Sequence, residues 1–482
     1  MADVRGIYTI DRAGTATLVK NLEDGTGFFA VRDSVTITPA PRKQVMAAGQ
    51  NRYEGSVQVG ETHDNGTYAW QCLVAGSSID DALTKAEALL GVGEAFGPGR
   101  YLGWSPAGAT NISYCEIRGA FTFKPGYQPQ QFVQTKTWVV DVSVPVAPLV
   151  RKSTLQTISI ASTTMPAVTA LSGTVGGNAP NLADISLRTS GGSAAPIWAL
   201  VAWWKRVTAT PLSGSVAPVG LIEAESGTMT TWSSTADASY RGGNGAQATT
   251  SGAGTAQTVI PVDPSVLTPD DFTQSTVDVE VWVDYRLAST VVSPRLIASM
   301  TPTSGFGATR YTEMGAAGRL LTLPSTGTVK RFTRLGVLTM PVDTLSPVKW
   351  DLKIAASWAA GSSGAFGADY VCLVPVRQSA RGRTGVANDS GYPKFIASTS
   401  DTTKIVRSDL SGAVASAAGN PAADTGLGGS RLWLPPGTVD LLVKLSSTVP
   451  DNPTVDASDE QLSHTGVTGS VSLVNRYWLT VS

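Results

Sequence analysis

Apolar and polar residues alternate with a period of two along most of this chain. The clearest runs span 137–146, 277–285, 439–445 and 471–482, where most alternate residues are apolar. In a β-strand, successive side chains point to opposite faces, so this period is typical of strands that bury one face. The pattern predicts an all-β fold with several half-buried strands.

The segment 53–74 also alternates, on both sides of Asp64-Asn65-Gly66. An Asn-Gly pair readily supplies the positive φ angles that a two-residue hairpin turn requires. We therefore expect the two halves of this segment to pair with each other as a β-hairpin.

One segment departs from the strand pattern and predicts a single α-helix over 78–90. Ser78 and Asp81 form a helix-start signal, and Gly91 stands where a helix would end. The apolar residues of the segment recur at spacings of three and four: Ile79, Leu83, Ala86 and Leu90.

Clusters of Pro and Gly divide the chain and predict three domains. Residues 1–150 form a β-sandwich with the one helix. Residues 151–217 together with 378–482 form a second β-sandwich, split by an insertion. The inserted residues 218–377 have the length of a β-sandwich with a jelly-roll fold.

Composition narrows the function. Only 15% of the 482 residues are charged and the net charge is -1, so the basic patch of a nucleic-acid-binding protein is not expected. Two histidines exclude most histidine-dependent catalysis, and no phosphate-binding, zinc-protease or serine-hydrolase motif occurs. The three cysteines form no CxxC pair and are expected to be buried thiols. We therefore expect that the protein is not an enzyme.

The N-terminus has no apolar stretch typical of a signal peptide. The densest apolar run, 197–204, is far shorter than the roughly 20 residues that span a bilayer. We therefore expect a product made in the cytoplasm, without membrane insertion.

Three carboxylates are candidate metal ligands. Glu223 and Glu225 open the inserted domain, and Asp369 lies in its last strand. The first and last strands of an antiparallel sandwich are commonly neighbours, so these oxygens can converge on Ca²⁺. The alternative is that they are solvated carboxylates at strand edges.

Three aromatic residues are candidates for contact with a glycan or a protein partner. Trp282 falls on the polar face of its strand, between Glu280 and Asp284. An aromatic ring on a wet face can stack on a sugar, or it can be covered by a loop or a neighbouring domain. Trp232 and Tyr240, in a loop-like segment, raise the same two alternatives.

Several segments resemble a known family. The first 150 residues resemble the N-terminal domain of distal tail proteins and related minor tail proteins of long-tailed, siphovirus-type bacteriophages. The segments that carry this resemblance are 64–76, the helix 77–90, Arg100–Phe121 and the strand 135–149. Segments 176–191, 434–447 and 470–482 resemble strands of the second β-domain of such proteins. Segments 220–230 and 368–376 resemble the first and last strands of galectin-like jelly rolls of carbohydrate-binding modules.

The resemblance implies a virion structural protein of the tail and baseplate, not an enzyme. In that family the N-terminal domain forms a ring, usually a hexamer, that joins the tail tube to the tail tip. The outer domains project and contact host-surface glycans during attachment. The expected partners are other copies of this chain, tail tube and tail-tip proteins, and host cell-wall glycans. Two alternatives stay open: a carbohydrate-binding surface adhesin without a ring, and a glycan hydrolase with a carboxylate pair.

Overall fold

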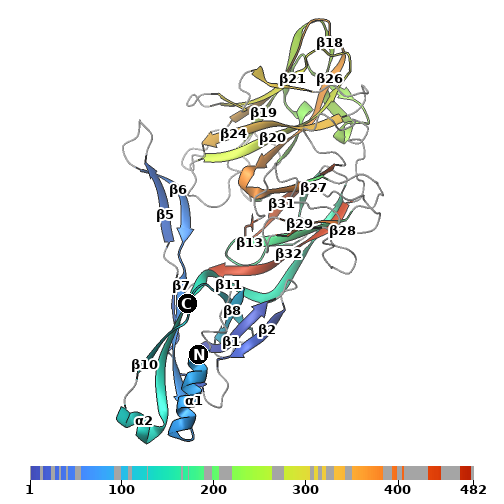
Figure 1. The fold of residues 1–482 in the computed structure, drawn as a ribbon. Coiled ribbons are helices and arrows are strands. Elements are labelled where there is room, and N and C mark those ends of the chain that lie inside the picture. Colours follow the sequence, from blue (N-terminus) through green and yellow to red (C-terminus); the bar gives the residue numbers. More distant parts are fainter. Residues whose placement is uncertain are drawn as a thin grey trace. The chain divides into compact units, whose positions relative to one another are not determined.

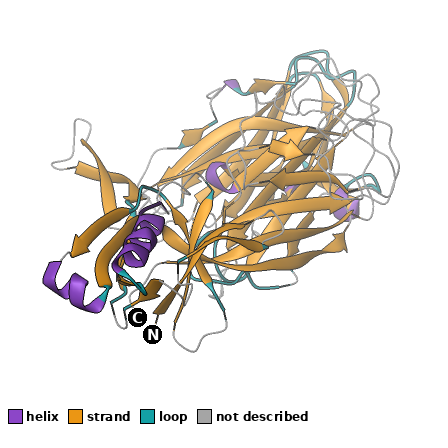
Figure 2. Cartoon of the chain, turned by 60° about the horizontal axis from the view of Figure 1, so that its bottom comes forward, coloured by secondary structure: helices purple, strands orange, loops and turns teal. Residues whose placement is uncertain are grey.

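The fold was analysed in a computed structural model of the 482-residue chain. It describes residues 2–10, 15–22, 28–31, 34–39, 42–48, 56–91, 99–106, 111–126, 129–163, 167–171, 173–188, 198–205, 220–262, 276–303, 309–312, 317–321, 330–341, 350–383, 393–398, 404–406, 433–446 and 467–478. Strands dominate these residues, as the alternation predicted, and the fold is all-β and multidomain (Figure 2). Among the described helices, none is long and apolar enough to cross a membrane.

The chain divides into two compact units. Unit 1 comprises 1–156, 176–181 and 473–482, and unit 2 comprises 157–175 and 182–472. The predicted domain boundary between residues 150 and 151 lies inside a continuous strand, the 27-residue β11 (Thr137–Thr163). The division into three domains stays a prediction.

Unit 1 is built from two antiparallel sheets that share β11 and from a separate two-stranded sheet of β5 and β6. One sheet has the order β2-β1-β8-β9-β11, and the other joins β10, β11, β7 and the short strands β3 and β4 (Figure 1). The strands are β1 (Ala2–Ile10), β2 (Ala16–Asn21), β3 (Phe28–Ala30), β4 (Thr36–Thr38), β5 (Arg42–Ala48), β6 (Ser56–His63), β7 (Gly66–Ala75), β8 (Arg100–Pro106), β9 (Ser113–Ile117) and β10 (Thr122–Gly126).

The alternating apolar positions of unit 1 form its core. Val140, Val142, Val144 and Val146 of β11 are all buried, as the sequence pattern predicted. They pack with side chains from both sheets, including Trp70 of β7. The core also holds Cys72 and Cys115, which are free and buried, and burial raises the pKa of the Cys115 thiol to about 12.

The predicted helix is confirmed as α1 (Ile79–Leu90). The Ser78 hydroxyl accepts a hydrogen bond from the Asp81 N–H at 3.0 Å, which satisfies one of the N–H groups that a helix start leaves unpaired. A second helix, α2 (Pro129–Thr135), was not predicted from the sequence. The two helices lie next to each other in both views, and the Lys136 ammonium donates to the Ser77 carbonyl (Figures 1 and 2).

The predicted hairpin at Asp64-Asn65-Gly66 is wrong. Both strands exist, but β6 pairs with β5 and β7 pairs with β11, β3 and β4. Neither Asn65 nor Gly66 adopts a positive φ, so the chain does not reverse there. An Asn-Gly pair permits a tight turn, but the pairing partners available to each strand decide whether one forms.

Unit 2 contains a four-stranded sheet, β12-β31-β14-β27, and two six-stranded sheets that face each other as a jelly roll. Strands outside the jelly roll are β12 (Ala167–Ala170), β13 (Asn181–Arg188), β14 (Trp198–Lys205), β27 (Ser379–Arg383), β28 (Pro393–Ser398), β29 (Lys404–Val406), β30 (Trp433–Leu434), β31 (Val439–Ser446) and β32 (Val467–Trp478), the last of which ends in unit 1.

The jelly roll spans the described part of 220–378. Its first sheet holds β15 (Leu221–Glu223), β17 (Ser233–Ala236), β18 (Asn244–Ser251), β20 (Thr276–Leu287), β24 (Lys330–Pro341) and β26 (Ser363–Pro375). Its second sheet holds β16 (Thr228–Thr230), β19 (Gly254–Val262), β21 (Arg295–Pro302), β22 (Arg310–Tyr311), β23 (Arg319–Leu320) and β25 (Trp350–Trp358). Short 3-10 helices are η2 (Ala224–Ser226), η3 (Arg241–Gly243) and η6 (Val376–Gln378).

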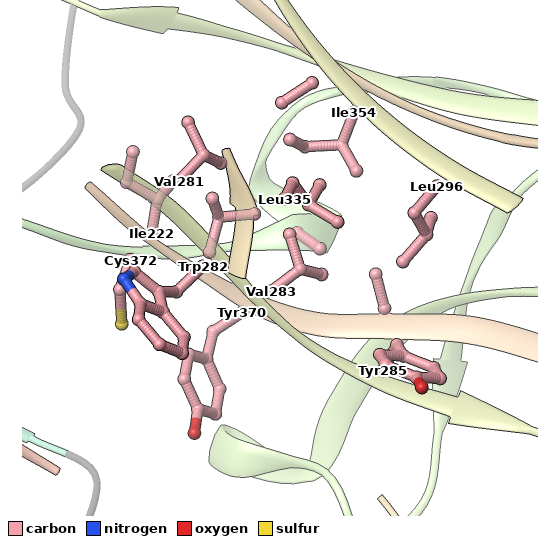
Figure 3. Packing of buried hydrophobic residues seen from close by; sticks show 14 of the residues in the cluster. Ile222, Val281, Trp282, Val283, Tyr285, Leu296, Leu335, Ile354, Tyr370 and Cys372 are labelled. Atoms are coloured by element: carbon pink, nitrogen blue, oxygen red, sulfur yellow. The ribbon is translucent and has the colours of Figure 1, made fainter. Parts of the chain in front are cut away.

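The core between the two sheets follows the predicted period. Val281 and Val283 of β20 point toward Leu296 and Ile354 of the opposite sheet (Figure 3). Figure 3 also shows Trp282, Tyr370 and Cys372 gathered on the other face of the first sheet. Both faces of this first sheet are therefore buried.

Candidate functional site

The candidate carboxylates lie where the first and last strands of the jelly roll meet. β15 pairs with β26, with Glu223 opposite Tyr370, so the expected adjacency of these strands is confirmed. Asp369 precedes Tyr370 on β26 and is fully buried. The local fold thus brings Glu223 and Asp369 to one end of the sandwich.

Nitrogen donors of the chain surround Asp369. The Arg241 backbone N–H lies 2.9 Å from each carboxylate oxygen, and Lys330 Nζ lies 2.5 Å from Oδ2. Burial, together with the nearby Asp284 carboxylate, raises the pKa of Asp369 to about 6, while the Lys330 ammonium opposes this rise. Lys330 and Asp369 thus form an ion pair whose carboxylate has no contact with solvent.

The two glutamates are only partly paired. Glu223 forms an ion pair with the Arg241 guanidinium through Oε1. The Oε2 atoms of Glu223 and Glu225 are buried and have no hydrogen-bond partner. Burial accordingly raises the pKa of Glu225. These two oxygens are of the type that Ca²⁺ prefers.

The residues as placed do not fit a calcium ion. Arg241 and Lys330 already neutralise Glu223 and Asp369, and no three Asp, Glu, His or Cys side chains of the described residues are grouped to hold a metal. Calcium binding stays a prediction that requires Lys330 to leave Asp369.

Trp282 does not lie on a wet face, which corrects the expectation from its polar neighbours. Its side chain is fully buried and stacks on Phe332 with ring centroids 5.1 Å apart. The indole N–H donates to the Glu280 carboxylate at 3.1 Å, and Glu280 is itself paired with Arg334. The polar neighbour Glu280 therefore accepts a buried hydrogen bond from Trp282 and does not mark a solvent-exposed ligand site.

The four-stranded sheet of unit 2 supplies the cover over this face. Trp204 of β14 belongs to the same buried cluster as Trp282, and its ring lies against Gly220. The Lys444 ammonium of β31 donates to the Tyr370 hydroxyl at 2.8 Å and lies over the Phe332 ring. The alternative of a covering neighbour, left open by the sequence, therefore applies to Trp282.

Trp232 and Tyr240 are also buried. The Trp232 indole N–H donates to the Phe366 carbonyl at 3.1 Å. The Tyr240 hydroxyl donates to Gln247 Oε1 at 2.7 Å, and its ring packs over Gly245. Neither ring is available to stack on a sugar, so of the two alternatives left open by the sequence the covered one applies to both.

An exposed aromatic residue that the sequence did not single out is Tyr311. It pairs with Ser299 at the edge of the second jelly-roll sheet and is 48% exposed. Leu296, Ala298 and Met300 point into the core, so Ser299 and Tyr311 share the outer face, where Ser299 is buried and Tyr311 is exposed. Leu320 of β23, which lies opposite Arg295 of β21, is 54% exposed. The outer face of this sheet also carries polar side chains on its other strands: Gln257, Lys353 and Ser357.

Only the structure identifies this surface, because β22 and β23 are two residues long and leave no periodic signal. Lys330 and Arg241 were missed for a related reason. Both contact Asp369 from segments far away in sequence, and no local spacing links them.

Neither a protein-family model nor a curated protein sequence matches the chain. Similar solved structures include the Dit protein of phage SPP1, described as a hub adsorption apparatus of phages that infect Gram-positive bacteria, with 13% identity over 44% of this chain and 72% of that one and a TM-score of 0.27. A carbohydrate-binding module of the β-sandwich superfamily has 10% identity over 73% of this chain and 99% of that one, at a TM-score of 0.22.

The phage p2 baseplate structure has 6% identity over 77% of this chain and 98% of the matched chain, at a TM-score of 0.22. TM-scores this low carry no argument about function. The strands and sheets themselves identify the chain as an all-β, multidomain protein.

Proposed function

We propose that this chain is a structural protein of a bacteriophage virion. In this proposal unit 1 assembles into a ring, a hexamer in the simplest case, in the distal tail between tail tube and tail tip. The β-sandwich domains of unit 2 project from that ring. The role is non-enzymatic.

The observation that carries the proposal is the sheet formed by β5 and β6. These strands pair with each other over seven registered positions and with no other described strand. An isolated two-stranded sheet is at best marginally stable in water. A neighbouring subunit that covers such an arm would supply the missing contacts, which is the situation of a protein that works inside an assembly.

The resemblance of unit 1 to distal tail proteins supports the same proposal. Its most specific segment, residues 100–110, begins with β8, which pairs with β1 on one side and with β9 on the other. The three cysteines are free and buried, which is consistent with a role that depends on shape.

The proposal is tested by mass and by location. Light scattering of the purified full chain is expected to give a closed ring, about 300 kDa for six copies of the 50.0 kDa chain. Gold-labelled antibodies against the chain are expected to mark the tail end of purified virions. A monomer in solution, together with no label on virions, would overturn the proposal.

A second candidate function is glycan binding by the jelly roll, without any ring. The exposed Tyr311 on the outer sheet favours it, because an aromatic ring beside polar side chains is suited to stacking on a sugar. Glycan binding by the jelly roll is compatible with both functions. In a tail protein the jelly roll would be a projecting domain, and in a surface lectin it would bind glycans without a ring. Retention of a monomer on a glycan column would favour the lectin.

Replacing Tyr311 by alanine is expected to weaken glycan binding by about fivefold, since a stacked ring contributes on the order of 1 kcal/mol. The probe is an array of bacterial cell-wall glycans, and Tyr311→Phe is the matched control because it keeps the ring. Equal binding by the alanine variant would exclude Tyr311 as the contact.

A further inference from the structure

Helix α1 presents an apolar stripe that its own unit does not cover. Ile79, Leu83 and Leu90 are 38%, 39% and 48% exposed. At about 100° per residue, these three positions lie within about 40° of one another on the helix surface. The core-facing residues of α1 are a different set: Ala82, Ala86 and Leu89. The exposed three residues are called the α1 stripe below.

Acidic side chains border the α1 stripe on its solvent side. Asp80 and Glu87 are both exposed, and the same helical geometry places them directly beside the stripe. The one basic residue of the helix, Lys85, is paired with Asp81 on another side. A partner that buries the stripe therefore meets negative charge along one border.

A second apolar surface lies on β2, which is called the β2 edge below. Leu18 and Val19 are 48% and 40% exposed. Among the described residues β2 pairs with β1 alone, so its other side is open. A register shift between Ile7 and Tyr8 leaves Val19 without a partner residue across the pair. Edge strands of natural proteins usually carry charged residues or are covered by another element, so exposed apolar residues on such an edge are unusual.

The two surfaces belong to different parts of unit 1. α1 packs on β7 of one sheet, whereas β2 is the outer strand of the other sheet. A surface that fits a different surface on an identical copy makes a head-to-tail contact. Repeated head-to-tail contacts form a ring when the rotation from copy to copy closes, and an open filament when it does not. Lys20, the residue after Val19 on β2, supplies the positive charge that would face Asp80 and Glu87.

We propose that the β2 edge of one copy docks on the α1 stripe of the next copy, with Lys20 beside Asp80 and Glu87. The inference rests on the proposed ring and names the surfaces that form its seam. Leu18 and Val19 cover Ile79, Leu83 and Leu90, so both exposed apolar surfaces are removed from water in one contact.

The first experiment places one charge in each surface of the full chain. Leu83→Glu and Val19→Glu are each expected to reduce the particle from about 300 kDa to the 50.0 kDa of one chain, measured by light scattering. Both side chains are exposed, so an unchanged circular-dichroism spectrum should accompany the loss and show that each variant still folds. Val292→Glu, at an apolar residue 42% exposed on the jelly roll, is the control that keeps the ring.

Mixing the two variants distinguishes a head-to-tail seam from a symmetric one. The Leu83→Glu chain keeps its β2 edge and the Val19→Glu chain keeps its α1 stripe, so each mixed pair can form one contact and no more. An equimolar mixture is therefore expected to give dimers. Rings from either variant alone, or a mixture that stays monomeric, would overturn the seam.

A charge exchange gives an independent measurement. Lys20→Glu and Glu87→Lys are each expected to weaken assembly at low salt, and the double variant is expected to regain it. Failure of the seam is distinguishable from failure of the proposed function. A wild-type ring that all variants leave intact overturns the seam alone, whereas a wild-type monomer absent from virions overturns both.

Discussion

Replacing Lys330 by methionine is expected to lower the free energy of unfolding of the jelly roll by about 3–5 kcal/mol. The ammonium is the cation paired with Asp369, which is fully buried, and removing one partner of a buried ion pair leaves the other charge unpaired. The Arg241 N–H bonds alone would then stabilise the carboxylate. Denaturant unfolding, followed by tryptophan fluorescence, measures the loss. Lys353→Met, on the outer sheet face, is the matched control.

The pH dependence of this loss identifies its cause. Lys330 opposes the rise in the pKa of Asp369, so its removal raises that pKa further above its usual value. A carboxyl group whose pKa is raised in the folded state stabilises the fold at low pH and loses this contribution as pH rises through the folded pKa. The loss of stability in Lys330→Met should therefore become smaller as the pH falls from 8 to 5. Adding Asp369→Asn to the same chain should abolish this pH dependence. A deficit independent of pH would mean that Lys330 acts through packing alone.

The same proteins test calcium binding. Because Lys330 and Arg241 already neutralise Asp369 and Glu223, we expect the melting temperature of the wild-type chain to be unchanged by Ca²⁺. A rise with Ca²⁺ in the wild type that disappears in Asp369→Ala would instead establish a calcium site formed by displacing Lys330. The buried, unpaired oxygens of Glu223 and Glu225 would then have their ligand.

Trp204→Ala is expected to lower the free energy of unfolding of unit 2 by about 3–5 kcal/mol. Trp204 is fully buried and lies in the same cluster as the jelly-roll core, so its removal opens a cavity between the four-stranded sheet and the jelly roll. Scanning calorimetry should show a lower melting temperature for unit 2. Tyr311→Ala, at an exposed ring, is expected to leave that temperature unchanged.

Gly220 provides a coupled test of the same contact. Its φ is +82°, and a Cβ atom there would lie 2.2 Å from the Trp204 ring. Gly220→Ala should therefore destabilise the wild type, both by the clash and by the strained backbone. In a Trp204→Ala background the clash is gone and the cost should fall to about 1 kcal/mol, so the two substitutions should be clearly non-additive. Additive losses would show that Trp204 and Gly220 do not share a contact.

The strands and the helix could be predicted from the sequence because local patterns determine them. The valines of β11 alternate with polar residues, and one buried face is the consequence. The hydrogen bond at the start of α1 joins Ser78 and Asp81, which are three residues apart. Both partners can therefore be recognised in the sequence. The neighbouring position of β15 and β26 followed from the general geometry of sandwiches.

The candidate site could be predicted only in part. Glu223 and Asp369 do lie at one end of the jelly roll, but the cations that pair with them come from distant segments. For Trp282, Trp232 and Tyr240 the sequence left both an exposed and a covered position open, and all three side chains are buried. Exposure depends on what packs over a face, and Lys444 and Trp204 reach that face from other strands.

The sequence by itself determined which segments are strands, where α1 begins and the all-β class, because hydrogen bonding and side-chain alternation act over a few residues. Only the tertiary structure decided which strands pair, as the failed hairpin at Asn65-Gly66 shows. It likewise decided that Asp369 faces Lys330, and that Leu83 and Val19 stay uncovered. Burial and charge pairing depend on residues brought together from across the chain, and no local pattern contains that information.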